Sequence, residues 1–350
     1  MKKRLLSILL AAMMILSLAA CGNSTSSDTK NPPAATDDKT TSDATSTEAV
    51  HLTLAHADTE TGSLFGECTI IFKEMVEEKS NGSIIVDIFP NGQLGTVSEY
   101  VTGIQSGSID LAPAVSSYIA NFCTNVSVFD MPFLFESYDH VWKTMDSEVG
   151  DTLTKDLENN GIIPLVWFGI GFRNVTSSES HPITSINDMK GFRIRTMTSP
   201  IHQALFQALG ADAVPMDWGE LYTALQQGTV DGEENPFGQV LSSNIWEVNP
   251  VIVKTEHAFT PAVFMMSPHV AEKLSEEQMS LIYECAKECA PIFRQKSVDI
   301  NNDALNTLIN EKGCTYVETI EKADLQAATA SVYDAYPQYA DLVESIRGLK

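Results

Sequence analysis

The chain has 350 residues, of which 43% are hydrophobic and 19% are charged, and its formal net charge is -24 at pH 7. A chain this acidic repels nucleic acids and anionic lipid surfaces, which argues against both as binding partners. An anionic ligand would have to be held by local positive groups, so the few arginines become informative. After the first 49 residues about 300 remain, enough to form about two domains.

The N-terminus has the pattern of an export signal. A basic head at residues 2–4 precedes an almost unbroken apolar run over residues 5–18. This run is too short to span a bilayer comfortably and is typical of a secretory signal. Residues 18–21, Leu-Ala-Ala-Cys, resemble the bacterial lipobox, in which the cysteine is lipidated. We therefore expect a signal peptide over residues 1–21, with Cys21 as the lipid-anchored mature N-terminus on the outer face of the cytoplasmic membrane.

The next segment, residues 22–49, consists almost entirely of small and polar residues. Such a composition cannot bury enough apolar surface to offset the entropy of ordering, so we expect a disordered tether. As a random coil, its roughly 28 residues would span about 30 Å on average. This length suits a folded domain that must reach a partner in the same membrane.

From residue 50 onwards, strand-like and helix-like segments alternate. Apolar residues at helical spacing between Leu64 and Val76 indicate the first helix, and Asn81-Gly82 ends it. The expected order is strand 51–55, helix 64–76, strand 84–89, helix 98–105 and strand 109–115. This is the βαβ rhythm of a mostly parallel α/β sheet.

A second series of elements follows. We expect helix 138–159, strands 162–168 and 191–195, helix 201–209, a helix ending at 226, strand 262–266 and helix 276–310. Asp217 and Glu220 would form a capping box for the helix that ends at 226. The last helix is too long for one small domain and could brace two.

These elements predict an α/β fold of the periplasmic-binding-protein type, with two lobes and a ligand cleft between them. We expect lobe 1 to comprise residues 50–172 and 261–297, and lobe 2 to comprise residues 173–260 and 298–350. In open α/β sheets the ligand lies beyond the carboxyl ends of the strands. Two lobes would place two such edges across one cleft, and hinge closure would trap the solute.

The cysteines do not suggest a disulfide framework, since five remain besides Cys21 and their spacing is irregular. Cys285 and Cys289 lie four residues apart on an expected helix, a spacing that could suggest a metal site. No histidine or second cysteine pair stands near them. We therefore expect buried small apolar side chains there, and neither a metal nor a cofactor.

Two arginines occupy positions suited to ligand binding. Arg173 follows a buried strand beside two glycines, which allow a ligand to approach closely. Arg195 comes at the carboxyl end of the strand over residues 192–194. An arginine fork matches a carboxylate in a bidentate way that lysine cannot. The alternative for any single arginine is a solvated surface charge.

These arginines belong to segments that carry a resemblance. The segments are FPNGQLG (89–95), GSIDL (107–111), GFRNVT (171–176), DMKGFRIR (188–195), PMDWGELYTALQ (215–226) and VDGEENP (230–236). In this order and spacing, from about residue 50 to residue 345, the chain resembles the solute-binding proteins of tripartite ATP-independent periplasmic (TRAP) transporters.

The resemblance implies a monomeric binding protein, not an enzyme, that closes on a carboxylate solute and hands it to a sodium-driven membrane permease. It implies that Arg195 makes the main bidentate contact with the ligand carboxylate, and that Arg173, Trp218 and Asn235 line the same cleft. The alternatives are a core tryptophan for Trp218 and a turn residue for Asn235. Polar residues near expected strand ends form a weaker set of candidates: His56, Ser116, Thr198 and His257.

Two departures from the sialic-acid-binding members of this family bear on the ligand. Those members carry an acidic residue after the third strand, where this chain has Val115-Ser116. They also carry an asparagine where this chain has Thr198. We therefore expect a smaller acid, either a hydroxylated sugar acid such as a uronate or a C4-type dicarboxylate.

Two other classes of function stay open on the sequence. An enzyme could use Asp231, Glu233 and Glu234 as a glycosidase-like acid pair, although this run also fits a solvated turn. A binding lipoprotein that feeds a sensor kinase would have the same pocket as one that feeds a permease.

Overall fold

The computed structural model describes residues 48–350. The expected signal peptide, the lipid attachment at Cys21 and nearly all of the expected tether therefore lie outside the described residues. No helix between residues 48 and 350 is both long enough and apolar enough to cross a membrane.

The first part of the fold follows the expected βαβ pattern. Its elements are β1 (Val50–Ala55), α1 (Leu64–Lys79), β2 (Ile84–Phe89), α2 (Val97–Ser106) and β3 (Leu111–Val115). Strand β1 pairs in parallel with both β2 and β3. Helix α2 begins with a capping box between Thr96 and Glu99, which satisfies backbone donors that the first helical turn leaves free.

The expected single helix over residues 138–159 is wrong. After the short α3 (Ser116–Ile119), the chain forms α4 (Tyr138–Met145) and α5 (Glu148–Asn159). Ser147 interrupts the helical run, because its side chain accepts a hydrogen bond from the Val149 N–H and so caps a new helix.

Two long antiparallel strands, β4 (Ile163–Ser177) and β8 (Val251–Met266), form the middle of the sheet. Both are much longer than expected, and Arg173 lies inside β4 instead of beyond a strand end. The glycines before Arg173 form an irregularity within the strand, between Gly169 and Gly171. Gly171 has a φ of +124°, and a Cβ there would lie 2.7 Å from the Asn301 amide nitrogen, so only glycine fits.

The remaining strands extend the sheet on the side of β4. They are β5 (Arg193–Thr196), β6 (Asp212–Pro215) and β7 (Gly232–Asn235), with helices α6 (Pro200–Ala208), α7 (Leu221–Gln226) and α8 (Phe237–Ser242) between and after them. The full order is β2-β1-β3-β8-β4-β7-β5-β6, with β9 (Thr315–Val317) paired to β8. The expected capping box of Asp217 and Glu220 does not form, because Asp217 accepts from the next residue and opens a 3₁₀ turn.

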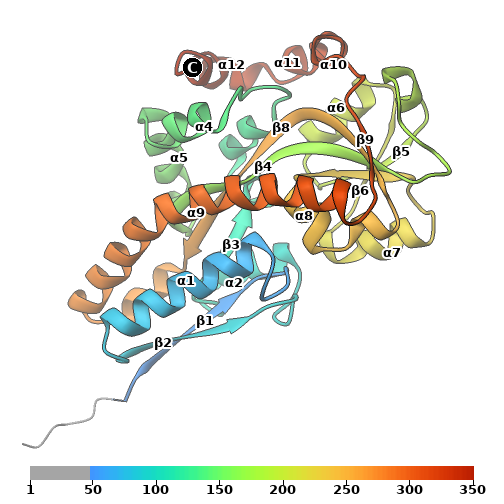
Figure 1. The fold of residues 1–350 in the computed structure, drawn as a ribbon. Coiled ribbons are helices and arrows are strands. Elements are labelled where there is room, and N and C mark those ends of the chain that lie inside the picture. Colours follow the sequence, from blue (N-terminus) through green and yellow to red (C-terminus); the bar gives the residue numbers. More distant parts are fainter. Residues whose placement is uncertain (1–47) are drawn as a thin grey trace, which may run out of the picture. The chain divides into compact units, whose positions relative to one another are not determined.

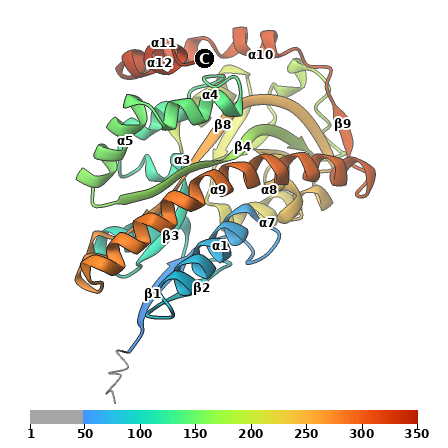
Figure 2. The same cartoon turned by 60° about the vertical axis from the view of Figure 1, so that its left-hand side comes forward.

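Helix α9 (Glu276–Asn310) has the bounds expected from the sequence. It contacts α1, β4 and α8, and Figures 1 and 2 show it running from the β1–β3 region to the β5–β7 region. It thus braces both parts of the α/β fold. The C-terminal helices are α10 (Lys322–Thr329), α11 (Ser331–Ala335) and α12 (Ala340–Arg347). The lobe boundaries expected from the sequence stay a prediction.

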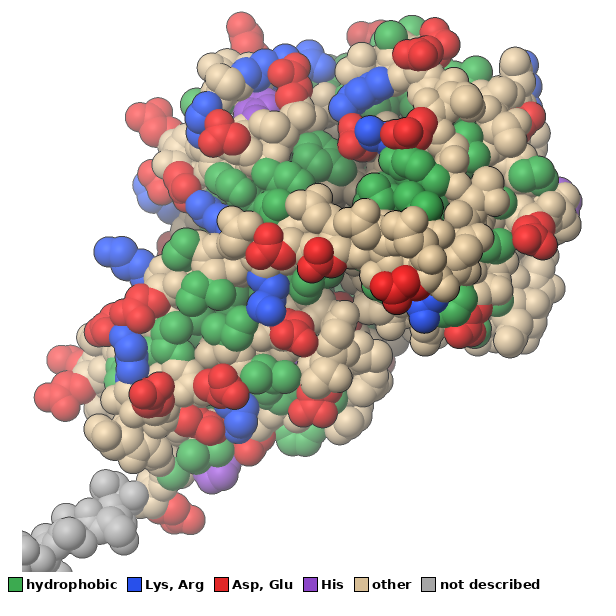
Figure 3. Space-filling view, viewed as in Figure 1, with side chains coloured by type: hydrophobic (Ala, Val, Ile, Leu, Met, Phe, Trp, Pro, Cys, Tyr) green, Lys and Arg blue, Asp and Glu red, His purple; other side chains and the backbone are tan. Residues whose placement is uncertain are grey.

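Charge and cysteine placement agree with the composition. Acidic side chains are spread over the face shown in Figure 3 instead of gathering in one patch. The five cysteines within residues 48–350 are all buried and free, as expected for small apolar side chains. Cys289 Sγ lies 3.9 Å from Met75 Sδ, inside the contact between α9 and α1.

Candidate functional site

A cavity lies among β4, β5, β7 and the loop after β1. Apolar side chains form much of its wall, including Phe65, Val97, Ile170 and Met197. The polar side chains that line it are Asp58, Tyr118, Arg173, Arg195, Trp218, Asn235 and Gln239. Four of the residues singled out in the sequence, Arg173, Arg195, Trp218 and Asn235, are therefore brought together.

Arg195 is buried at the cavity without an acidic partner. Its side chain comes from β5 and is 1% exposed. Its Nε and Nη2 donate to the Met216 carbonyl oxygen at 3.2 and 2.9 Å, and Nη2 also donates to the Tyr118 hydroxyl at 3.2 Å. Within residues 48–350 no carboxylate lies in ion-pair contact with this guanidinium, which leaves a buried positive charge facing the cavity.

Trp218 lies against the guanidinium group of Arg195. Its ring centroid lies 5.9 Å from the Arg195 guanidinium carbon, within the range of a cation–π contact. Trp218 is partly buried, packs against the hydrophobic cluster around Leu221 and Val240, and also forms part of the cavity wall.

Arg173, in contrast, already has a carboxylate partner. Its Nε and Nη2 donate to the two carboxylate oxygens of Glu234 on the neighbouring strand β7, and Nη1 donates to Thr260 Oγ1 at 3.2 Å. The pairing follows from the sheet, because β4 and β7 run antiparallel with Glu234 opposite Val175. Arg173 lies two residues before Val175 and so reaches Glu234 diagonally across the two strands. The positive charge of Arg173 is thus balanced inside the protein.

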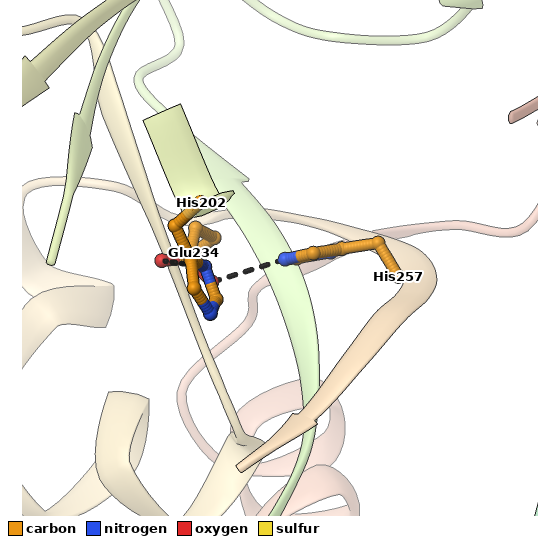
Figure 4. A group of neighbouring side chains, drawn as sticks. All are labelled: His202, Glu234 and His257. Atoms are coloured by element: carbon orange, nitrogen blue, oxygen red, sulfur yellow. Dashed lines mark hydrogen bonds and ion pairs between the residues drawn. The ribbon is translucent and has the colours of Figure 1, made fainter. Parts of the chain in front are cut away.

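Two histidines flank Glu234, as Figure 4 shows. His257 Nε2 lies 3.0 Å from one Glu234 oxygen, and His202 Nδ1 lies 3.7 Å from the other. Burial would raise the pKa of Glu234, but the Arg173 guanidinium and the two histidines outweigh it and hold this pKa well below its usual range. Burial lowers the pKa of His257, so this ring is neutral at neutral pH.

The same three side chains could also be considered as metal ligands. His202, Glu234 and His257 present ligand atoms within 4.8 Å of one another. Both oxygens of Glu234 already accept hydrogen bonds from Arg173, so a metal ion would sit against a guanidinium cation. We therefore assign this cluster to the support of Arg173. The acidic run over residues 231–234 is buried, so its interpretation as a solvated turn is wrong.

Asn235 is the last residue of β7 and is buried, not part of a turn. Its amide nitrogen donates to Glu233, which also accepts from Thr176 Oγ1 at 3.0 Å. Burial, together with the neighbouring Glu234, raises the pKa of Glu233 to about 7. The hydrogen bond to Glu233 therefore fixes the orientation of the Asn235 amide, and Asn235 lines the cavity.

The weaker candidates do not line the cavity. His56 and His257 are buried, and burial lowers the pKa of His56 to about 4. The hydroxyl groups of Ser116 and Thr198 are buried without a hydrogen-bond partner, although the residues before them, Val115 and Met197, do line the cavity.

Sequence reasoning missed three polar residues of the cavity, Asp58, Tyr118 and Gln239. Asp58 lies three residues after the end of β1, and the end of an expected strand was a signal that could have identified it. Tyr118 and Gln239 lie on the short helices α3 and α8, which carry no clear periodic pattern. Burial raises the pKa of Asp58 to about 6, against a hydrogen bond from Gln239 that lowers it.

The α/β fold with two lobes, and a largely apolar cavity that holds a few charged and polar groups, define a solute-binding protein. The chain belongs to the bacterial extracellular solute-binding proteins of family 7 (DctP), whose family model matches residues 54–339. The resemblance seen in the sequence is thereby confirmed at the level of the family.

Three similar proteins illustrate the relationship. The 2,3-diketo-L-gulonate-binding periplasmic protein YiaO of Escherichia coli is 31% identical over 280 residues, 79% of this chain and 85% of that protein. The sugar acid binding protein DctPAm of Advenella mimigardefordensis, solved with galactonate, has a TM-score of 0.82 and 29% identity over 86% of this chain and 98% of its own. A TRAP solute-binding protein of Sulfurospirillum deleyianum, solved with succinate, has a TM-score of 0.81 and 26% identity over 87% and 100%.

Proposed function

We propose that this protein is the extracytoplasmic binding component of a TRAP transporter, which captures a small organic acid and delivers it to the membrane permease. The observation that carries the proposal is the buried Arg195, which lines the cavity without an ion-pair partner among residues 48–350. A buried charge without a partner is costly, and a ligand carboxylate would supply the missing counter-charge. Nη1 of Arg195 makes no hydrogen bond with the described residues and is available for this contact.

The ligand we propose is a sugar acid or a C4-type dicarboxylate. Solved relatives hold galactonate, D-erythronate, D-glucuronate or succinate, and YiaO is named for 2,3-diketo-L-gulonate. Arg195 would hold the carboxylate, with Trp218 against the apolar face of the ligand. Arg173 and Asn235, fixed by Glu234 and Glu233, would add hydrogen bonds.

Closure would occur between lobes divided as the sequence suggests, at residues 172/173, 260/261 and 297/298. Two contacts join these proposed lobes across the cavity: Arg195 Nη2 to the Tyr118 hydroxyl, and Gln239 Nε2 to Asp58 Oδ1. We propose that the protein acts as a monomer, tethered through lipidated Cys21 on the outer face of the cytoplasmic membrane. No metal or cofactor is required for this role.

Thermal unfolding against a panel of organic and sugar acids tests the function. A ligand at 100 times its Kd stabilises the folded state by about 2.7 kcal/mol. The best ligand should be recovered unaltered by mass spectrometry, and small-angle scattering should show compaction at saturation. Turnover of the ligand, or an unchanged radius of gyration, would contradict a binding protein that closes on its solute. If membrane vesicles with the permease take up the ligand only when the protein is present, the sensor-kinase alternative is excluded.

A further inference from the structure

Besides Arg195, the cavity lining contains a second charged residue without an ion-pair partner among residues 48–350, namely Asp58. This residue lies in the loop between β1 and α1 and is 9% exposed. Its Oδ1 accepts a hydrogen bond from Gln239 Nε2 on α8 at 3.1 Å. Its Oδ2 makes no hydrogen bond with the side chains of residues 48–350. One carboxylate oxygen is therefore held in place while the other is available to whatever occupies the cavity.

The charges of the cavity constrain what can occupy it. Arg173 is neutralised by Glu234, so the groups left without a charge partner are Arg195 and Asp58. A ligand carboxylate belongs at Arg195, and the rest of the ligand then faces Asp58. An ionised carboxylate only accepts hydrogen bonds, so it needs donors on the ligand. A second ligand carboxylate would meet a like charge in a buried cavity, which strongly disfavours its binding.

We propose that Asp58, held by Gln239, is a specificity-determining residue that accepts hydrogen bonds from ligand hydroxyl groups and rejects a second carboxylate. The ligand class is then a polyhydroxy monocarboxylate and not a C4 dicarboxylate. This inference rests on the proposed function, because it requires Arg195 to hold the single carboxylate. Asp58 could instead have a purely structural role, in which it only accepts the hydrogen bond from Gln239. Its substitution would then weaken all ligands alike, so the ratio of the affinities for hydroxy acids and for succinate separates the two roles.

Calorimetric titration with D-galactonate, D-erythronate, D-glucuronate, succinate and butyrate tests the proposal. A site built to bind hydroxyl groups strongly rejects analogues that lack them. In the wild type, at least one hydroxy acid should therefore bind at least about 100-fold more tightly than succinate and butyrate. Asp58→Asn removes the charge at nearly constant shape and should weaken that hydroxy acid about 10- to 100-fold, while leaving succinate unchanged or stronger. Glu60→Gln, an exposed acid in the same loop, is the matched control and should change every Kd by less than about threefold.

The outcomes separate the inference from the proposed function. If succinate binds the wild type as tightly as every hydroxy acid, and Arg195→Ala still abolishes binding, the role of Asp58 is overturned while the carboxylate site stands. If Asp58→Asn weakens all ligands equally, Asp58 has only the structural role of binding Gln239, and its proposed role in specificity is also overturned. If no acid of the panel binds, or Arg195→Ala has no effect, the proposed function fails and the inference with it. The wild-type ratio decides the matter even if Asp58→Asn does not fold.

Discussion

Arg173 and Arg195 line the same cavity, but only Arg173 has a carboxylate partner, Glu234. Both guanidinium groups are 1% exposed, so the difference does not come from solvent. It comes from the sheet, which places Glu234 beside Arg173 and leaves Arg195 with a backbone carbonyl and a tyrosine hydroxyl. The two arginines should therefore respond differently to truncation.

Truncation of Arg195 should mainly affect binding. Arg195→Ala removes the counter-charge of the ligand carboxylate, which costs roughly 2–5 kcal/mol. At 1.4 kcal/mol per decade, this is about 30-fold to a few thousand-fold in Kd. Arg195→Lys keeps the charge but loses the fork, so it should lie between the wild type and Arg195→Ala. Calorimetric titration with one ligand measures all variants.

The control for this prediction is Arg193, two residues earlier on β5. Its guanidinium is half-exposed and paired with Asp231, away from the cavity lining. Arg193→Ala should therefore change Kd by less than about threefold. Equal losses at both arginines would point to bulk electrostatics, and an unchanged Kd in Arg195→Ala would falsify the assignment of the carboxylate site.

Truncation of Arg173 should mainly affect stability. Arg173→Ala leaves Glu234 buried without its cation, and breaking a buried pair in this way costs about 3–5 kcal/mol. The double variant Arg173→Met, Glu234→Gln leaves no orphaned charge and should lose less than the sum of its single variants. Urea unfolding measures all of these free energies. Arg195→Ala orphans no carboxylate, so a loss of stability as large as that of Arg173→Ala would contradict the contrast between the two residues.

The sequence predicted the local elements well, because the patterns of β1 to β3 and of α9 are carried by residues close in the chain. It failed where long-range pairing decides the structure. The glycines before Arg173 suggest the end of a strand, but β8, about 90 residues later in the chain, continues the sheet across them. The acidic residues at 233 and 234 suggest a solvated turn, but Glu234 is buried because β7 brings it to Arg173.

The candidate site, like the fold, was predictable from local motifs but not where residues far apart in the chain meet. Motif resemblance singled out Arg173, Arg195, Trp218 and Asn235, and all four line the cavity. Their roles toward a ligand stay predictions. Asp58 and Gln239 are 181 residues apart and meet only when the two sides of the cavity come together. No local pattern could show that this pair shares a site with Arg195.

The lipid anchor can be tested separately from the binding site. Cys21→Ser removes the thiol that lipidation requires, and Cys21 is 29 residues before Val50, the first residue of β1. We therefore expect unchanged ligand affinity and unchanged thermal unfolding, with release of the protein from the membrane fraction. Mass spectrometry of the native N-terminus is the direct measurement. An unmodified mature N-terminus at another residue would rule out the anchor.

The raised pKa of Asp58 predicts a pH dependence of stability. Its pKa in the folded protein is about 6, above its usual value of 3.8, so folding disfavours the ionised form. This carboxyl group therefore stabilises the protein most when it is protonated, and that stability is lost as the pH rises from about 4 through 6. The shift of about 2 units corresponds to roughly 3 kcal/mol.

Asp58→Asn isolates this contribution from the other titrating groups. His56, whose pKa is lowered to about 4, acts in the opposite direction, because it destabilises the folded protein as the pH falls below 6.5. Glu233, with its pKa raised to about 7, acts in the same direction as Asp58. The free energy of unfolding of Asp58→Asn relative to the wild type should therefore increase by roughly 2 kcal/mol between pH 4.5 and pH 7.5. Urea unfolding of both proteins across this range is the measurement, and a constant difference would show that Asp58 does not titrate in this window.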